Sequence, residues 1–450
     1  MTDSLKSEAV FTRQERIAEL AKQSREFAFL SLNHYLDLKW LDAAYARTRK
    51  DGAVGVDGQT AADYAVDLEA NLQSLLDRAQ SGTYRAPPVR RVQIPKGPGS
   101  KETRPLGIPT FEEKVLQRAV AMLLEPIYEQ DFLDCSYGFR PGRSAHQALG
   151  ALREGLMQFG GGWILDVDIR KFFDTLQHGP LRELLRQRIR DGVVLRLIGK
   201  WLNAGVWENG TLTHPDEGTP QGGVISPLLA NIYLHYVLDV WFEQEVKPRL
   251  AGRAFLIRFA DDFVMVFQHE ADARRVLEVL PKRFAKYGLT LHPEKTRLVC
   301  FVRPDRACST PAASVVAGQG TAGPVSGTFD LLGFTHYWGR SRNGYWVVKR
   351  KTARSRLRRA ILTVGEWCRR NLHRPVAEQH RTLCQKLRGH FAYYGITGNS
   401  WSLSSFRDAV TETWRKWLSR RNRARPMIWA VFGRLLERYP LPMPRIVHAV

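Results

Sequence analysis

Two adjacent carboxylates between two short apolar segments constrain this chain more than any other feature. Asp261 and Asp262 separate the largely apolar residues 255–258 from the apolar residues 263–267, which predicts two strands joined by a tight turn. Aspartate tolerates turn geometry, so a plain hairpin is one interpretation. Neighbouring carboxylates repel each other, however, and a divalent cation with oxygen ligands removes that repulsion. A metal-binding turn is therefore the alternative interpretation.

A third carboxylate favours the metal-binding interpretation. Asp168 ends a strand predicted at residues 163–167 and precedes a helix predicted at residues 169–176. It could be the N-cap of that helix. A strand-end aspartate beside an Asp-Asp hairpin can also hold two ions about 3.5–4 Å apart, which clamp the attacking and leaving oxygens of an in-line displacement. The combination predicts a two-metal site.

The distribution of charge predicts a polyanionic partner. The net charge is +22, and residues 340–450 contribute +20 of it, from 25 Lys and Arg against 5 Asp and Glu. Solubility alone needs a much smaller charge. Nucleic acid and an acidic membrane surface are the two candidate partners. The sequence has no apolar stretch of membrane-spanning length, so we expect nucleic acid and no membrane.

The cysteines and the N-terminus predict where the protein works. The five cysteines include no Cys-x-x-Cys pair and match no zinc pattern, which is typical of a reducing compartment. Residues 1–16 are polar and lack the apolar core of a signal peptide. We therefore expect a cytoplasmic protein. Periodicity predicts helices at residues 1–50 and 61–79, a mixed α/β region to about residue 340, and basic helices after residue 350.

The order of several motifs resembles the reverse transcriptases of group II introns. These motifs are GVDG at 55–58, RPLGIPT at 104–110, SYGFRPGRSAHQAL at 136–149, DIRKFFD at 168–174, GTPQGGVISPLLANIYLHYVLD at 218–239, FADD at 259–262, LHPEKT at 291–296 and LLGF at 331–334. Phe259 stands where most members have tyrosine, which removes one hydroxyl beside the carboxylates. The segment GHFAYYGITGN at 389–399 resembles the thumb or maturase domain, and no cysteine cluster follows Cys384. We therefore do not expect the zinc-bearing nuclease domain of some members.

The resemblance implies a fold and an activity. It implies an α/β right-hand polymerase fold with fingers and palm, followed by an all-α basic thumb or maturase domain. The implied domains are an N-terminal helical extension at 1–60, fingers and palm at 61–340, thumb or maturase domain at 341–400 and a basic DNA-binding-like segment at 401–450. The implied activity is RNA-directed DNA synthesis with two Mg²⁺ ions, for which Mn²⁺ can substitute. The implied partners are RNA template, intron RNA, DNA primer or target, and dNTPs.

Two other functions are compatible with the same motifs. One is a maturase that acts mainly as an RNA-binding cofactor of splicing. The other is a domesticated reverse transcriptase, used in defence or associated with CRISPR.

The resemblance also implies roles for residues of the active site. Asp168, Asp261, Asp262 and the main chain of Ile169 would hold the metal ions. Residues implied in nucleotide binding are Lys96 and Arg104 on the triphosphate, Phe173 as a steric gate against a ribose 2′-hydroxyl, Gln221 and Gly222 beside the nucleotide, and Lys295 as proton donor to pyrophosphate. Each has a simpler explanation: solvated charges for the two turn residues and Lys295, a core aromatic for Phe173, and an ordinary turn for Gln221 and Gly222.

Two further groups predict contacts with nucleic acid. One mixes aromatic and basic side chains, as nucleic-acid tracks do: Tyr137, Phe139, Arg140 and Arg143. The other group is expected to lie in the predicted basic helices and to contact phosphate backbone: Lys349, Arg350, Lys351, Arg420, Arg421 and Arg423. A solvated charged face is the alternative for the second group.

Overall fold

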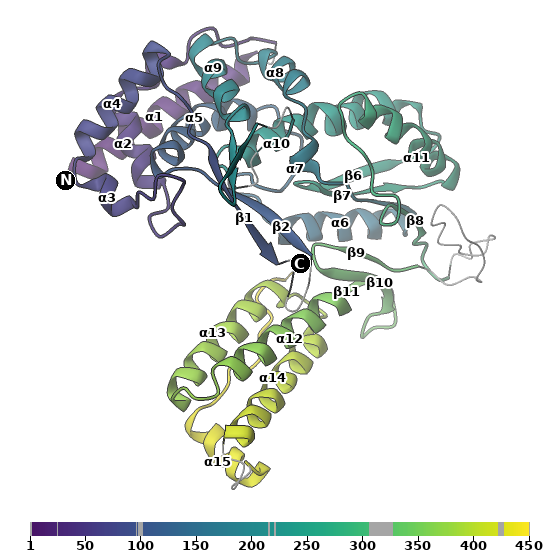
Figure 1. The fold of residues 1–450 in the computed structure, drawn as a ribbon. Coiled ribbons are helices and arrows are strands. Elements are labelled where there is room, and N and C mark those ends of the chain that lie inside the picture. The colour runs from purple at the N-terminus through teal and green to yellow at the C-terminus, as the bar shows by residue number, and fades with distance from the viewer. Residues whose placement is uncertain are drawn as a thin grey trace. The chain divides into compact units, whose positions relative to one another are not determined.

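The described part of the chain divides into two compact units. The computed structural model describes residues 2–24, 26–95, 97, 102–214, 217–219, 222–305, 327–421 and 427–449. Unit 1 comprises residues 1–94, 104–144 and 167–296, and unit 2 comprises residues 95–103, 145–166 and 297–450. The fold is mixed α/β with a helical C-terminal region, as the sequence predicts (Figure 1). No helix within the described ranges is both long and apolar enough to cross a membrane.

Unit 1 begins with a layer of helices around a buried central helix. The layer consists of α1 (Thr2–Gln23), α2 (Leu38–Arg47), α3 (Ala61–Ala65), α4 (Leu68–Ser81) and α5 (Phe111–Tyr128). Helices α1 and α2 both pack on α5, and Trp40 donates its indole N–H to the carbonyl of Ala119 at 2.9 Å. The single helix expected at 61–79 is divided, because Asp67 leaves helical geometry (φ −119°, ψ 49°). Short polar side chains such as Asp favour helix ends over helix interiors.

A four-stranded sheet follows in unit 1. It consists of β1 (Val89–Pro95), β2 (Thr103–Ile108), β4 (Val206–Glu208) and β5 (Thr211–Thr213), in the order β2-β1-β4-β5. Strand β1 runs parallel to β4, with Val89 opposite Val206, and β4 runs antiparallel to β5. Along the chain, three helices follow Asp168 and precede β4. They are α7 (Phe172–Thr175), α8 (His178–Arg186) and α9 (Gly192–Leu202). Asp191 begins α9 because its carboxylate accepts from the main-chain N–H of Val194 at 2.9 Å.

The predicted hairpin is present in unit 1. Strands β6 (Ala254–Phe259) and β7 (Asp262–Phe267) are antiparallel, with Phe259 opposite Asp262. Helix α10 (Ser226–Leu234) precedes the hairpin and α11 (Glu270–Ala285) follows it and packs on β7. The residues of β7 after Asp262 are all buried. The turn therefore presents its carboxylates from a rigid base.

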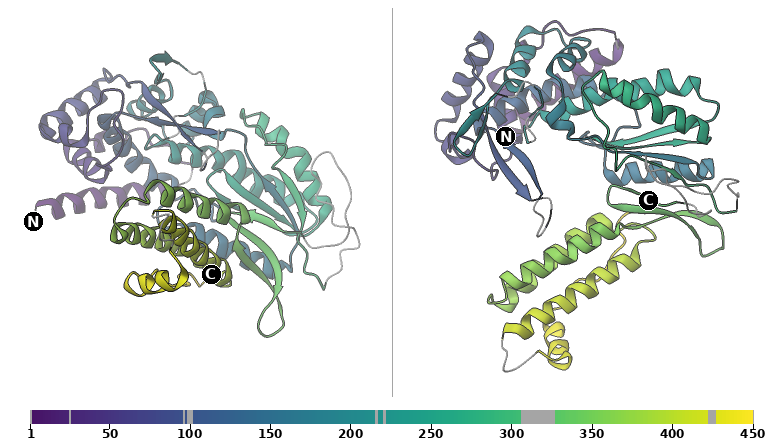
Figure 2. Two further views of the ribbon diagram at one scale, coloured as in Figure 1. Left: turned by 60° about the horizontal axis from the view of Figure 1, so that its bottom comes forward. Right: turned by 45° about the vertical axis from the view of Figure 1, so that its right-hand side comes forward.

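Unit 2 combines a small set of strands with a helical bundle. Its elements are α6 (Ala145–Phe159), β3 (Trp163–Val167), β8 (Arg297–Cys300), β9 (Phe329–Leu331), β10 (Phe334–Arg340), β11 (Trp346–Thr352), α12 (Arg354–Arg370), α13 (Val376–Tyr394), α14 (Ser400–Arg421) and α15 (Trp429–Arg438). Strand β3 is antiparallel to β8, and β10 is antiparallel to both β9 and β11. Helices α12, α13 and α14 lie side by side around a core that includes Leu387, Trp414 and Phe432 (Figure 2).

One sequence-based expectation about unit 2 is wrong. The residues 349–351 were expected to begin a basic helix, yet they lie in β11. The pairing of β11 with β10 along its whole length fixes them in extended conformation, with Lys349 opposite Tyr337 and Lys351 opposite Thr335. The basic helices begin only with α12 at Arg354.

Candidate catalytic site

The neighbouring carboxylates lie at the tip of the β6–β7 hairpin. Ala260 and Asp261 form the turn, and Ala260 has a left-handed backbone conformation with φ 58°. Asp262 is exposed at the start of β7, whereas Asp261 is half-buried. Burial raises the pKa of the Asp261 carboxyl, and the charge of Asp168 raises it further. Because this mutual influence requires proximity, Asp168 and Asp261 share one site.

The main chain around Asp168 is tied to the segment 290–295. The carbonyl of Asp168 accepts from the main-chain N–H of His292 at 2.7 Å, and Ile169 bridges to Leu291. From the same segment, Lys295 places its Nζ 2.7 Å from Oδ2 of Asp168. The predicted metal residues Asp168, Ile169 and Asp261 and the predicted proton donor Lys295 are thus together. The ammonium of Lys295 forms an ion pair directly with the Asp168 carboxylate.

The donor set fits a metal ion that arrives with its substrate. Within the described ranges, no three His, Cys, Asp or Glu side chains form a self-contained metal site. Mg²⁺ is usually bound by one or two carboxylates, with water and substrate phosphates completing its shell. Asp168 and Asp261 supply carboxylate oxygens as hard donors, and their negative charges repel each other. The Lys295 ammonium already stands beside Asp168 as a counter-cation, which shows that this carboxylate attracts positive charge.

A fully buried arginine holds the turn in place through a hydrogen bond to its main chain. Arg258 in β6 donates from Nε and Nη2 to the carboxylate of Asp239, at 2.7 and 2.5 Å. Its Nη1 donates to the carbonyl of Ala260 at 3.0 Å, directly before Asp261. Losing one partner of such a buried pair typically costs about 3–5 kcal/mol. Sequence reasoning missed this residue, although a charge within an otherwise apolar strand was a usable signal.

The segment 136–138 packs against the same turn. An added Cβ at Gly138 would lie 2.3 Å from the main-chain nitrogen of Ala260, so only glycine permits this approach. Asn231 on α10 donates to the carbonyl of Gly138 at 2.7 Å and accepts from Arg258 at 3.0 Å. Ser136 also accepts from Arg258, at 2.7 Å. The motif 136–149 therefore supports the catalytic turn through its first residues.

Phe173 lines a hollow, whereas its neighbour Phe172 lies in the hydrophobic core. A hollow of about 330 Å³ is lined by Phe173, with Lys171, Asp174, Gly218 and Thr219 among its other lining residues. The side chain of Phe172 is buried, with 2% exposed. The carbonyl of Phe173 accepts from the main-chain N–H of Thr219 at 2.8 Å, so the segments 171–174 and 218–219 lie together at this hollow.

The other predicted nucleotide residues divide into three groups. Arg104 is exposed on β2, and its charge lowers the pKa of Asp261, so it lies near that carboxylate. Gly222 has φ 124°, and an added Cβ would lie 2.3 Å from the carbonyl of Gly107. Lys96 and Gln221 lie outside the described residues.

Gln117 is a supporting residue that sequence reasoning missed. Its side-chain oxygen accepts from the main-chain N–H of Val224 at 2.8 Å, and its amide donates to Glu113 at 2.9 Å. Burial raises the pKa of Glu113 to about 8. Helix α5 thereby holds the segment that follows Gly222. A polar residue on the buried face of a helix was the available signal.

The aromatic and basic residues 137–143 have different environments. Phe139 is 60% exposed. Arg143 pairs with Asp134 at 2.6 Å and lies over the ring of Tyr137, which is buried. Arg140 is buried, and its guanidinium donates to Glu129 and to main-chain carbonyls. Phe139 and Arg143 are accessible to a ligand, whereas Arg140 holds the segment in place.

The predicted basic contacts of unit 2 also differ in exposure. Lys351 is exposed and Lys349 half-buried on β11, while Arg350 points inward and donates to the carbonyl of Leu149 at 3.2 Å. Burial lowers the pKa of Arg350 to about 10. Arg420 and Arg421 are exposed at the end of α14. Arg423 lies outside the described residues.

Comparisons with known proteins identify the family of this chain. A family model described as reverse transcriptase (RNA-dependent DNA polymerase) matches residues 94–336. Protein YkfC of Escherichia coli (strain K12) is 41% identical over 301 residues, which cover 58% of this chain and 76% of that protein. The group II intron-encoded protein LtrA of Lactococcus lactis subsp. cremoris is 40% identical over 247 residues, which cover 52% of this chain and 40% of LtrA. The chain thus spans less than half of LtrA.

Proposed function

Since this chain belongs to the reverse transcriptase family, we propose that it copies an RNA template into DNA by extending a primer with dNTPs. The observation that carries the proposal is the proximity of Asp168 and Asp261, together with a hollow lined by Phe173, five residues after Asp168. Phosphoryl transfer needs positioning and charge stabilisation more than covalent chemistry, and these residues offer both.

Asp168, Asp261 and the main chain of Ile169 would hold two Mg²⁺ ions, with Asp262 nearby. Bound there, the ions would polarise the α-phosphate and stabilise the attacking and leaving oxygens. The chain's own residues supply the frame. Arg258 fixes the turn through the carbonyl of Ala260, and residues 290–292 fix Asp168. Mn²⁺ has the same preference for oxygen ligands and could replace Mg²⁺.

Residues around the nucleotide would bind and select it. Arg104, which lies near Asp261, would contact the triphosphate, since guanidinium binds phosphate in bidentate fashion. Lys295 would leave Asp168 when cations arrive and could then protonate the pyrophosphate. Phe173 would exclude a 2′-hydroxyl from the hollow that it lines. We assign Lys96 and Gln221 to the same nucleotide on their motifs alone.

We further propose a right-hand polymerase fold whose basic C-terminal region binds intron RNA. The proposed division is an extension at 1–60, fingers and palm at 61–340, thumb or maturase domain at 341–400 and a DNA-binding-like segment at 401–450. The net charge of +20 after residue 339 supports RNA binding there. Splicing assistance would need this binding and no chemistry. The relative named group II intron-encoded protein favours this second activity over a defence role.

Replacing the proposed metal ligands tests the catalytic proposal. Asp261→Asn keeps the shape of the side chain and removes its charge, and Asp168→Asn does the same at the second position. We expect each to lower primer extension on an RNA template by at least about a thousandfold, since electrostatic stabilisation of that size is typical of such groups. Glu278→Gln, an exposed carboxylate on α11, is the control and should extend normally.

RNA affinity should remain near that of the wild type in all three variants, because binding depends on the basic surface. Near-normal extension by Asp261→Asn would refute the polymerase proposal. Splicing assistance that survives in Asp261→Asn would show that the maturase activity is separate from polymerisation.

A further inference from the structure

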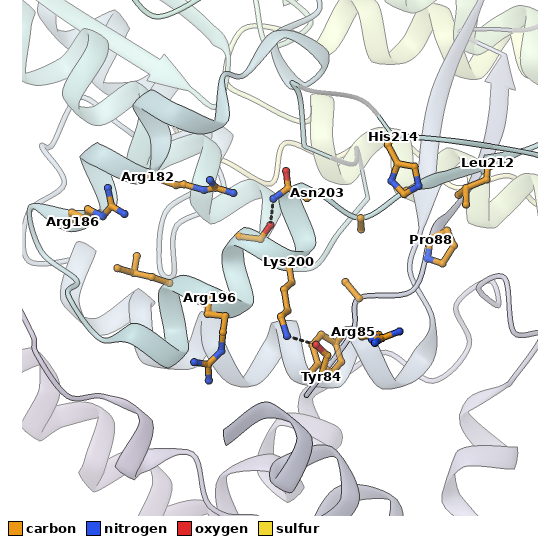
Figure 3. Close-up of a pocket in the computed structure, with 15 residues that line it drawn as sticks. Tyr84, Arg85, Pro88, Arg182, Arg186, Arg196, Lys200, Asn203, Leu212 and His214 are labelled. Carbon is orange, nitrogen blue, oxygen red and sulfur yellow. Dashed lines mark hydrogen bonds between the residues drawn. The ribbon is translucent and has the colours of Figure 1, made fainter. Parts of the chain in front are cut away.

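A strongly basic hollow in unit 1 lies outside the catalytic residues described above. It has a volume of about 730 Å³ and lies between residues 84–88, which follow α4, helices α8 and α9, and strand β5 (Figure 3). Its cationic side chains include two pairs at a spacing of four residues, Arg182 with Arg186 on α8 and Arg196 with Lys200 on α9. Arg85 adds a fifth positive charge. Among the described residues that line it, none is Asp or Glu.

This arrangement is unfavourable without a ligand. Like charges four residues apart destabilise a helix by about 0.2–0.5 kcal/mol per pair, and here two such pairs face one hollow. Within the described part of the chain, the side chains of Arg85, Arg182 and Arg186 make no hydrogen bond or ion pair. Arg85 and Arg186 are exposed, and Arg182 is half-buried. Three guanidinium groups are therefore available to an anion.

The remaining two cations are held in place by main chain. Lys200 donates to the carbonyl of Gly82 at 2.6 Å, and Arg196 donates to the carbonyl of Gln80 at 3.3 Å. Glycines leave room beside the guanidinium groups. An added Cβ at Gly82 would lie 3.2 Å from Cζ of Arg196, and one at Gly199 would lie 3.5 Å from a terminal nitrogen of Arg182. The positive charges are thus positioned before any ligand arrives.

The chemistry of the walls identifies a phosphate-bearing ligand. The planar guanidinium matches the oxygens of phosphate, and arginine supplies most of the charge here. Pro88 and Leu212 give the side of the hollow away from Arg182 and Arg186 an apolar surface, as Figure 3 shows, on which a base or sugar can lie. Phosphate and apolar ring surface occur together in nucleotides and in nucleic-acid strands.

The position of the hollow favours a strand over a free nucleotide. Ala204 lines this hollow and also lines the hollow that contains Phe173. The segment 202–206 is therefore a shared wall between the proposed nucleotide site and the basic hollow. A strand that pairs with the incoming nucleotide can continue past this wall, and its phosphates then reach the arginines of α8 and α9.

We propose that the basic hollow binds the backbone phosphates of the single-stranded RNA template next to the nucleotide site. This proposal rests on the proposed polymerase function. It assigns Arg182 and Arg186 as template-binding residues, with Arg85 on the other side of the hollow. The alternative source of the same chemistry is a free nucleotide or polyphosphate.

The test is a binding measurement with the full chain and without nucleotides. The variant Arg182→Gln/Arg186→Gln removes two charges that hold no other part of the fold. Its matched control is Lys282→Gln/Lys286→Gln, an exposed pair with the same spacing at the end of α11. Fluorescence anisotropy would compare DNA-primed RNA templates that have a blunt end, a short overhang or a long single-stranded overhang.

We expect the Arg182→Gln/Arg186→Gln variant to bind the long-overhang template about tenfold more weakly than wild type, with little change for the blunt template. Its log–log salt slope on the long overhang should fall by roughly 1.4, since each phosphate contact to a single strand contributes about 0.7. The Lys282→Gln/Lys286→Gln control should retain the wild-type values. Equal losses in both variants, or a loss that does not depend on the overhang, would overturn the proposal.

A second measurement separates the template from a free ligand. Inorganic tripolyphosphate that binds the wild type and not the arginine variant, together with a raised KM for dNTP at every overhang length, would assign the hollow to a free phosphate compound and overturn the proposal. Because binding is measured without catalysis, a wild-type chain that fails to extend primers but shows the overhang effect would refute the polymerase function and leave this site standing.

Discussion

At the scale of single residues, the adjacent Phe172 and Phe173, which follow Asp168, have different environments. Phe172 is core, with 2% of its side chain exposed, whereas Phe173 lines a hollow. Their ring planes are 72° apart. Only Phe173 is therefore open to a ligand in that hollow, and the neighbouring ring supplies an internal control.

Phe173→Ala should raise incorporation of ribonucleotides relative to deoxyribonucleotides by up to about a hundredfold. The ring would displace a bound ribonucleotide, and a displacement of about 1 Å lowers the reaction rate by about that factor. Phe172→Ala should destabilise the protein by about 3–5 kcal/mol and leave discrimination unchanged. Single-nucleotide extension with both nucleotide types measures the first effect, and urea unfolding measures the second. Relaxed discrimination in Phe172→Ala but not in Phe173→Ala would show that the gate is the other ring.

The sequence predicted which proposed site residues lie together better than it predicted the residues that hold them in place. Asp168, Asp261 and Lys295 stand in motifs whose order is informative, and the structure brings them together. Arg258 and Gln117 act through hydrogen bonds to distant segments, and such partners depend on how the chain folds back on itself. No local pattern encodes those partners, so only the burial of a polar residue hinted at them.

At the scale of elements, helix α5 carries a buried acid at its start. Glu113 is 1% exposed, and its Oε2 has no hydrogen-bond partner among the described residues. Burial raises the pKa of its carboxyl to about 8. A neutral carboxyl suits this environment, because it can donate as well as accept.

Glu113 should make stability depend on pH. Its pKa is higher in the folded protein than in the unfolded chain, so its contribution is fully present below about pH 4.5 and is lost as the pH rises towards 8. Glu113→Gln mimics the neutral form. We expect this variant to lose less of its unfolding free energy as the pH rises, and to be more stable than wild type at pH 8 by on the order of a few kcal/mol. One pKa unit corresponds to about 1.4 kcal/mol.

Urea unfolding at pH 5 and pH 8 measures this difference. Glu112→Gln is the control, because Glu112 pairs with Arg78 near the surface at 2.7 Å. It should lower stability slightly at both pH values. A pH dependence that is unchanged in Glu113→Gln would show that the residue is charged in the folded protein.

Element boundaries were the weaker part of the sequence-based prediction. Periodicity identified the helical segment that contains α4, which has one apolar side, and two short apolar segments identified the β6–β7 hairpin. It placed residues 349–351 in a helix, although pairing with β10 holds them in a strand. Basic residues occur in both kinds of element, and pairing with a distant strand leaves no local trace.

At the scale of the whole molecule, positive charge is concentrated in the C-terminal quarter of the chain. Exposed arginines stand on α12 and α14, and Arg354 and Arg358 line a hollow of about 600 Å³ in unit 2 together with Arg297. Such a surface would bind RNA through phosphates with little regard to sequence.

Replacing Arg354, Arg358 and Arg420 together with glutamine should weaken RNA binding and reduce its salt slope by roughly 2, at about 0.7 to 0.9 per lost contact. Primer extension at saturating RNA should change little. Titrations of RNA affinity against salt provide the measurement. The comparison is a triple variant of exposed unit 1 residues, Arg190, Lys282 and Lys286. If both triple variants reduce the slope equally, net charge rather than the C-terminal region determines affinity.

The two units are interleaved along the chain, and this sets an order of events during synthesis. Strand β3 belongs to unit 2 and pairs with β8, with Trp163 opposite Cys300. A ribosome that adds about 5–20 residues per second would deliver β8 on the order of ten seconds after β3. Throughout that interval the apolar strand β3 lacks its pairing with β8. Yield in the cell should therefore respond to translation speed, growth temperature and chaperone supply.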